Sequence, residues 1–170
     1  MTPPGRDEAA DYYFTYIDQV PAGDIVEVLA TQMDEALGVM GGVTDRGSRH
    51  RYAADKWTIA QVVAHINDTE RVFVYRALWF ARECEGPLPS FDQNVAMPSS
   101  GADDRPWGSH IDEFRAVRTA TVALFRHMPP DAWARRGVAS GHPVTVRALA
   151  YITAGHVAHH VRILRERYLS

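Results

Sequence analysis

Three of the eight histidines in this sequence are spaced so that their imidazole rings can meet. His156 and His160 are four residues apart in a segment with helical periodicity, which puts both rings on one face, one turn apart. Ile152 and Ile163 share this narrow stripe, so it is the expected core-facing side of the helix. Two imidazoles in a core stripe need polar partners, and one divalent metal ion would satisfy both.

His65 lies at the border of the apolar face of an earlier helical segment, about 60° around the helix from Val62. Taken alone, an interior histidine is more often a hydrogen-bonded core residue than a metal ligand. If the two helices are neighbours, however, His65, His156 and His160 converge on one cavity. Three neutral histidines with open coordination positions are typical of a catalytic divalent-metal site, so we predict a metal centre, with core histidines as the alternative.

The remaining histidines are weaker candidates. His50, His110 and His127 lie before a helical segment, at a helix start and at a helix end, where surface or capping roles are expected. His142 lies in a predicted loop that can approach the mouth of a site. His159 points to the edge of the core stripe, where it can orient a ligand or replace its neighbour as the third one.

Glu70, Asp68 and Asp92 are the candidates for proton transfer beside the metal, or for orienting one of its ligands. Glu70 falls inside an apolar face, where an ionised carboxylate needs a partner. The metalloprotease motif His-Glu-x-x-His, the Gly-x-Ser-x-Gly turn, the phosphate-binding loop and the dinucleotide fingerprint are all missing. Cys84, the single cysteine, is expected to be half-buried and inert rather than a nucleophile.

Four segments with helical periodicity must position these residues. They run from Asp24 to Gly41, from about Trp57 to about Cys84, from Ser109 to just before Pro129, and from about Thr145 to Tyr168. Glu27 follows Asp24, and Asp112 follows Ser109, at capping-box spacing. A first piece, residues 7–19, is helical or irregular. No segment alternates apolar and polar residues as a strand does, so the predicted fold is all-α, a four-helix bundle.

The connection at residues 85–108 is too long for an ordinary loop and contains four prolines. Because it also carries Leu88, Phe91 and Met97, we expect an ordered loop packed across one end of the bundle, above the metal centre.

Length, charge and hydropathy exclude several classes of protein. The 170 residues predict a single domain, residues 1–170, with a core of its own. A net charge of −3 without a basic run argues against nucleic-acid binding. No apolar run is long enough to span a membrane, and the acidic start is unlike a signal peptide. We therefore expect a soluble, cytoplasmic protein that acts on a small molecule.

Several motifs together resemble the DinB-like (DinB/YfiT) superfamily. They are KWTIAQVVAHI at residues 56–66 with DTER at 68–71, LPSFDQ at 88–93, GHPV at 141–144, and LAY at 149–151 leading to HVAHH at 156–160. The resemblance extends from about Tyr12 to Tyr168, and it is the combination of the Trp-Thr…His helix with a late His-x-x-x-His that makes it specific.

The resemblance implies a four-helix bundle in which His65, His156 and His160 hold one divalent metal, usually zinc or nickel. It also implies a homodimer, for which exposed apolar residues such as Trp79, Phe80 and those from Tyr12 to Phe14 are a second argument. Activities in the family include transferases and isomerases that use low-molecular-weight bacterial thiols, and metal-dependent hydrolases. We expect a thiol S-transferase, with a small-molecule hydrolase or a non-catalytic metal-binding or dimerisation bundle as the alternatives.

Overall fold

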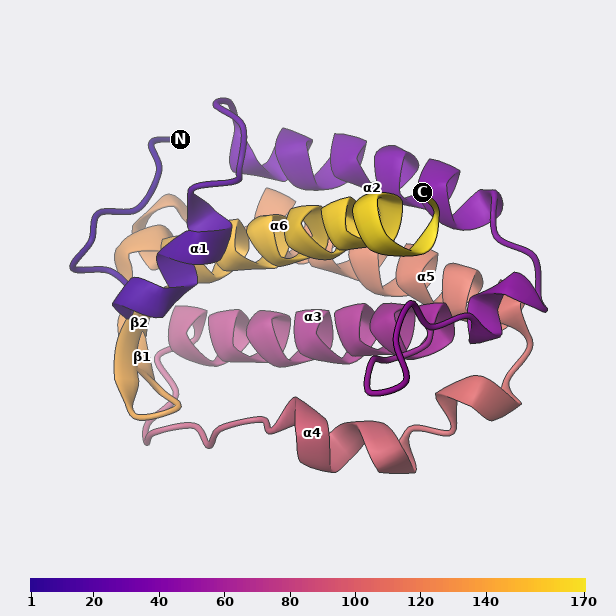
Figure 1. Cartoon of the computed structure of the whole chain (residues 1–170). Helices are drawn as coiled ribbons and strands as arrows, with labels where there is room; N and C mark the ends of the chain where they lie inside the picture. Colours follow the sequence, from indigo (N-terminus) through magenta and orange to yellow (C-terminus); the bar gives the residue numbers. More distant parts are fainter.

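Four long helices form the body of the molecule in the computed structural model, which describes residues 1–170 (Figure 1). They are α2 (Ile25–Gly41), α3 (Ile59–Ala81), α5 (Trp107–Arg126) and α6 (Val146–Ile163). α2 and α3 each pack mainly against α5 and α6, so α2 stands diagonally opposite α3, and α5 stands diagonally opposite α6. The predicted four-helix bundle is confirmed, with one small sheet that the prediction lacked.

Side-chain caps explain where three of the helices begin. Asp24 accepts hydrogen bonds from the first turn of α2, and Thr145 accepts one from the Ala148 amide at the start of α6. At the start of α3, Thr58 and Gln61 form a reciprocal capping box. Each cap satisfies amides that the helix itself leaves free, which is why these boundaries lie close to the predicted ones.

The predicted start of α5 was wrong. The helix begins at Trp107, directly after Pro106, so Ser109 and Asp112 lie inside its first turns. The Ser109 hydroxyl donates to the Pro106 carbonyl at 2.7 Å, and Asp112 pairs with Arg115 at 2.9 Å. Neither side chain caps the helix, because proline already fixes the backbone where the chain enters it.

A short N-terminal helix, α1 (Phe14–Ile17), packs against α6 after a 3-10 turn at Asp11–Tyr13. Gly155 of α6 makes this approach possible, because a Cβ at that position would lie 2.1 Å from the Tyr16 carbonyl oxygen. This close approach places the Tyr16 ring beside His156, the residue after Gly155. Tyr13, Phe14 and Phe80 are buried, so most of the apolar residues expected to be exposed for a dimer are in the core.

A β-hairpin precedes α6, and the sequence analysis missed it. β1 (Arg136–Ala139) pairs antiparallel with β2 (His142–Thr145) through a turn at Ser140 and Gly141. Both turn residues have positive φ, 53° and 79°, which suits a two-residue hairpin turn. His142 therefore lies on a strand rather than in a loop.

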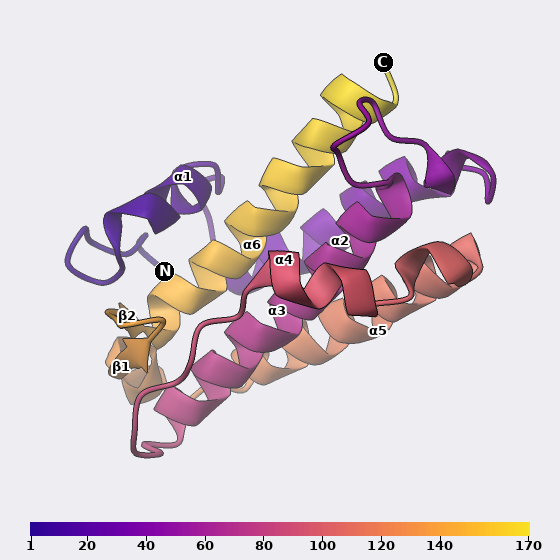
Figure 2. The ribbon, with the colours of Figure 1, turned by 60° about the horizontal axis from the view of Figure 1, so that its bottom comes forward.

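Residues 85–106 run along α3 instead of crossing one end of the bundle, which corrects the prediction (Figure 2). At one end, the Leu88 amide donates to Val138 of the hairpin at 2.9 Å. At the other end, the Thr58 hydroxyl donates to Asp103 at 2.7 Å, beside the start of α3. Between these anchors lie α4 (Gln93–Ala96) and a 3-10 turn at Met97–Ser99, and Asp103 itself belongs to a second 3-10 turn, Ala102–Asp104, so the segment is ordered as expected.

The chain ends with a wide helical turn, Leu164–Tyr168, that continues α6. The Tyr168 hydroxyl donates to the Trp57 carbonyl at 2.7 Å, which ties this end of α6 to the residues just before α3. A further 3-10 turn lies at Gly47–Arg49 and another at Pro130–Ala134.

Two other expectations can be compared with the structure. Cys84, expected to be half-buried, is exposed. No helix has the length and apolar character needed to cross a bilayer.

Candidate metal centre

α3 and α6 bring the three predicted histidines together. The Nε2 atom of His156 lies 3.0 Å from Nε2 of His65 and 3.1 Å from Nε2 of His160. One nitrogen from each ring falls within 4.8 Å of the other two. The i, i+4 spacing on α6 supplies one pair, and the packing of α6 against α3 supplies the third ring, so the arrangement follows directly from the bundle.

Burial keeps these imidazoles neutral. The side chains of His65 and His156 are buried, and His160 is half-buried. Loss of hydration lowers the pKa of His65 to about 4 and that of His160 to about 3, and it lowers the pKa of His156 well below its ordinary value. A neutral imidazole has a free lone pair, which is the form that binds a metal ion.

The donor set fits a divalent transition metal. Zinc–nitrogen bonds of about 2.1 Å in a tetrahedron place the nitrogens roughly 3.4 Å apart, close to the spacing found here. Nδ1 of His65 lies 3.1 Å from the Thr69 hydroxyl, so the tautomer with its proton on Nδ1 can donate to this oxygen and leave the Nε2 lone pair for a metal. Three protein nitrogens leave at least one coordination position for a substrate or for water.

Aromatic rings surround the three histidines. The Tyr16 ring meets His156 edge-on at 5.4 Å between centroids and His159 at 5.3 Å. The Trp57 ring lies 5.1 Å from that of His65. His159 is half-buried beside the cluster but is not one of the three histidines that meet. Its position therefore does not support the expectation that it could replace His160 as a ligand.

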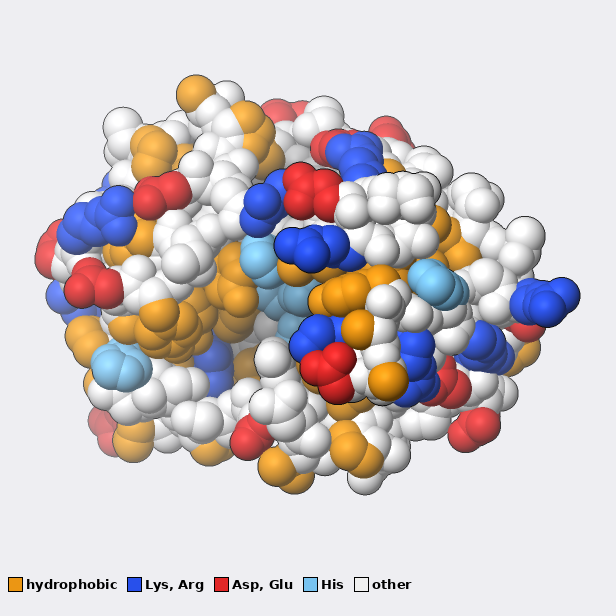
Figure 3. All heavy atoms as spheres, in the orientation of Figure 1, with side chains coloured by type: hydrophobic (Ala, Val, Ile, Leu, Met, Phe, Trp, Pro, Cys, Tyr) orange, Lys and Arg blue, Asp and Glu red, His pale blue; other side chains and the backbone are white.

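Two cavities reach the cluster from different sides, and in Figure 3 histidine side chains appear in a hollow at the centre of one face. The first cavity, of about 390 Å³, has His156 in its wall and extends past Tyr12, Tyr16 and Phe73 toward the hairpin. The second, of about 270 Å³, has His160 in its wall and lies near Trp57 and Tyr168. The histidines are therefore accessible to small molecules even though they are largely buried.

Glu70 does not face the histidines. Both of its carboxylate oxygens accept hydrogen bonds from the Arg118 guanidinium, at 2.9 and 2.8 Å, between α3 and α5. The two side chains are 1% and 0% exposed, and Arg118 also donates to the Leu29 carbonyl and to Gln32. The predicted need for a partner is confirmed, and the pair occupies the bundle interior rather than either cavity.

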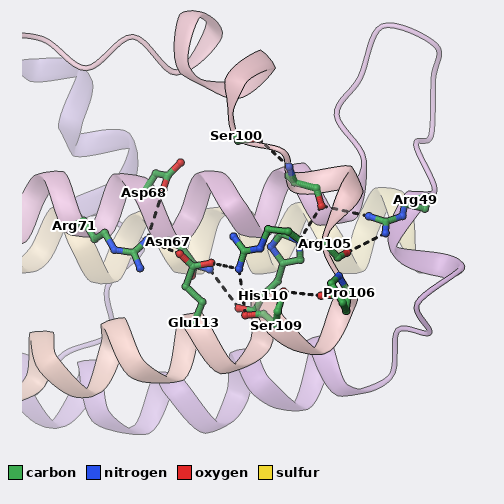
Figure 4. A network of polar contacts seen from close by, with 11 residues as sticks. Arg49, Asn67, Asp68, Arg71, Ser100, Arg105, Pro106, Ser109, His110 and Glu113 are labelled. Atoms are coloured by element: carbon green, nitrogen blue, oxygen red, sulfur yellow. Dashed lines mark hydrogen bonds and ion pairs between the residues drawn. The ribbon is translucent and has the colours of Figure 1, made fainter.

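Asp68 and Asp92 also lie away from the three histidines. Asp68 forms an ion pair with Arg71 at 3.6 Å, and partial burial outweighs that contact and raises its pKa (Figure 4). Asp92 is exposed and caps α4 by accepting a hydrogen bond from the Asn94 amide at 2.8 Å. Neither carboxylate lines the first cavity, although Gln93, the neighbour of Asp92, does.

The other histidines divide into exposed and structural ones. His50 and His127 are exposed, in line with the prediction. His110 is fully buried, which corrects the expected surface or capping role: its Nε2 lies 2.9 Å from the Ala102 carbonyl, within the polar network of Figure 4. In that network Arg49 ties residues 102 and 105 to the 3-10 turn at Gly47–Arg49, and Arg105 ties the same segment to Glu113 of α5. His142 lines the first cavity, as a site-mouth residue would.

Arg76 and Tyr16 line the first cavity but are not among the predicted site residues. Arg76 follows His65 by eleven residues, which returns the helix to within about 20° of the same face. That periodicity was a usable signal for Arg76. For Tyr16 the signal was weaker: a glycine directly before His156 marks a close backbone approach but does not say which segment approaches.

Comparison with known proteins agrees with this architecture. The family model of the DinB superfamily matches residues 8–164. The chain belongs to the DinB superfamily. Among curated proteins, no sequence matches it.

Two solved structures share the fold. One is YfiT from Bacillus subtilis, described as a probable metal-dependent hydrolase with an unusual four-helix bundle topology: TM-score 0.69, 18% identity, covering 97% of this chain and 90% of that one. The other is a mycothiol-dependent maleylpyruvate isomerase: TM-score 0.71, 13% identity, covering 86% of this chain. The match spans only 61% of the isomerase chain.

Proposed function

We propose that this protein is a metal-dependent enzyme that transfers a low-molecular-weight thiol to an electrophilic small molecule. His65, His156 and His160 would hold one divalent ion, zinc or nickel. The observation that carries the proposal is the meeting of three imidazole nitrogens, from two helices, beside two cavities. Such an ion, bound by neutral ligands, keeps its full charge and lowers the pKa of a thiol or a water molecule that binds it.

The shortage of carboxylates in the cavity walls is one argument for thiol transfer. No Asp or Glu lines the first cavity, and the one in the second, Asp55, forms a hydrogen bond with Lys56 at 2.6 Å. Hydrolysis normally needs a general acid for the departing amine or alkoxide, whereas a thiolate attacks without one. In the transfer, sulfur bonds to the electrophilic carbon as the leaving group departs with its electron pair, and the thiol proton passes to solvent.

The chain's own residues would bind and orient the reactants. Tyr16 and Gln93 stand in the wall of the first cavity, where their hydroxyl and amide groups can hydrogen-bond an electrophile. Phe73 and Tyr13 supply apolar surface beside His156 and restrict the water that reaches it.

Hydrolysis is the second candidate. YfiT, which has the same fold, is described as a probable metal-dependent hydrolase, and His142 in the cavity wall is able to donate a proton. A non-catalytic metal-binding bundle is the third, and it predicts a metal without turnover of any substrate.

Elemental analysis of the purified protein and of three variants tests the metal. We expect about one transition-metal ion per chain, retained in His50→Ala and lost in His65→Ala, His156→Ala and His160→Ala. His50 is the matched control because it is exposed and does not belong to the cluster. A protein that binds no metal, or variants that all keep it, would contradict the proposed centre.

Turnover of a model electrophile such as monobromobimane, with and without bacterial thiols, tests the reaction. We expect conjugate formation above the uncatalysed rate only when both metal and thiol are present. An ester or amide hydrolysed at the same rate without thiol would favour the hydrolase instead. Metal-loaded protein inactive in both assays would favour the non-catalytic bundle.

We also propose a homodimer, and the family resemblance is its main support. Of the apolar residues first considered, Tyr12 alone is half exposed, and Trp79 is partly buried. Light scattering at micromolar concentration gives the test, because a monomer mass would remove this part of the proposal.

A further inference from the structure

Arg76 is a buried cation without a carboxylate partner. Its side chain is 3% exposed, yet no Asp or Glu lies within ion-pair distance of it. Its Nη2 atom donates to the Pro89 carbonyl at 2.8 Å and to the Ser140 hydroxyl at 3.0 Å. Its Nε and Nη1 atoms make no hydrogen bond inside the protein, so donors remain available.

A buried guanidinium normally has an anion beside it, because removal of a charge from water costs several kcal/mol. Arg118, the other fully buried arginine, follows this rule through its two hydrogen bonds to Glu70. Arg76 instead borders the first cavity, whose wall contains no acidic residue. Arg76 also lines a neighbouring cavity of about 370 Å³ beside Leu88 and Phe91, again without an acidic residue, so it borders space that a ligand can occupy.

Arg76 and the histidines belong to one continuous surface. His65, Thr69, Val72 and Arg76 follow each other at helical spacing on one side of α3, and the last three line the first cavity. The helical rise places the Cα atom of Arg76 roughly 16 Å along the axis from that of His65. His156, one of the three, lines the same cavity, so a ligand within it can contact both His156 and Arg76.

We propose that Arg76 binds a carboxylate group of the substrate while the reacting end of that molecule points at the three histidines. The substrate is then an elongated carboxylic acid, with Ser90 and Ser140 beside its carboxylate in the cavity wall. The position of the reacting end rests on the proposed function, whereas the carboxylate site does not require it.

Matched pairs of thiols test both the carboxylate site at Arg76 and the position of the reacting end at the histidines. The probes are ω-mercapto acids of three to eight carbons, each with the ω-mercapto alcohol of equal length, titrated into cobalt-loaded protein. The thiolate–cobalt absorption band reports binding at the histidines. In parallel, plain alkanoates and alkanols of the same lengths are titrated into metal-free protein by calorimetry, which measures the carboxylate site alone.

We expect the acid of the best length to bind about tenfold or more tightly than its alcohol, as charge-assisted hydrogen bonds require. In Arg76→Gln this preference should fall to about one, while Arg76→Lys should retain part of it. Arg82→Gln is the control: it removes the same charge from an exposed position just beyond α3 and should keep the full preference.

Each result has one meaning. Equal binding of acid and alcohol, or a preference that persists in Arg76→Gln, would overturn the carboxylate site, and a cobalt band seen with either thiol would leave the proposed function standing. A preference in metal-free protein, lost in Arg76→Gln but with no cobalt band from any thiol, would support the carboxylate site and contradict thiol binding. If Arg76→Gln lowers the free energy of unfolding but leaves the preference for the acid over the alcohol unchanged, Arg76 has only a structural role, through its hydrogen bonds to Pro89 and Ser140.

Discussion

Replacement of Glu70 by glutamine distinguishes a structural carboxylate from a catalytic one. In the structure Glu70 neutralises Arg118, and both side chains are out of contact with water. Glutamine keeps the shape but removes the charge, so the guanidinium stays buried without its counter-ion. Loss of one partner of a buried pair costs about 3–5 kcal/mol, and the retained amide oxygen puts Glu70→Gln near about 3 kcal/mol. For a protein of this size the melting temperature should fall by roughly 6–12 °C.

Urea unfolding and thermal unfolding measure this loss, and metal content with kcat/KM per folded molecule measures the site. We expect the free energy of unfolding to fall while metal content and activity stay at the wild-type level, because neither cavity includes Glu70. The double variant Glu70→Leu, Arg118→Met should recover much of the stability, since no charge is left buried. Glu70→Gln with wild-type stability and lost activity would refute this reasoning and restore Glu70 as a proton-transfer group.

Three further predictions concern the histidines and their surroundings. Burial lowers the pKa of His65 to about 4 and that of His160 to about 3, so below pH 6.5 the unfolded chain binds protons before the folded one does. The metal-free protein should therefore lose about 2 kcal/mol per buried histidine between pH 7 and pH 5, and equal urea midpoints at the two pH values would contradict this. Gly155→Ala should displace α1 from α6 and weaken thiol binding more than Gly38→Ala, a helical glycine with open space around it, as compared by calorimetry. His159→Ala should keep its metal, and elemental analysis showing less than half occupancy would make it a ligand.

The three histidines were predictable because the relevant information is local to each helix. A spacing of four on α6 and a place beside an apolar stripe on α3 define which way each ring points. The fold class followed from the same periodicity, and the caps at Asp24, Thr58 and Thr145 are signals that act within one turn.

What the sequence did not predict depends on contacts between distant segments. The path of residues 85–106 is decided by Leu88 at the hairpin and by Asp103 at Thr58, which no local pattern encodes. The hairpin was missed because its strands have four residues each, too few for an alternation to show. Arg118 gave no sign of burial, since an arginine within a helix of mixed polarity is ordinarily at the surface.

The packing of α3 against α6, two helices far apart in the sequence, has a consequence for how the chain matures. His65 and His156 are 91 residues apart in the sequence, and they meet only after α6 has paired with α3. Closure of so long a loop is an entropic cost that must be met before any metal can bind with full affinity. If the three histidines hold the proposed ion, its uptake follows completion of the topology, and the bound ion opposes unfolding by a free energy that rises with the logarithm of the metal concentration. Under that proposal, metal-free chains would unfold more readily than metal-loaded ones.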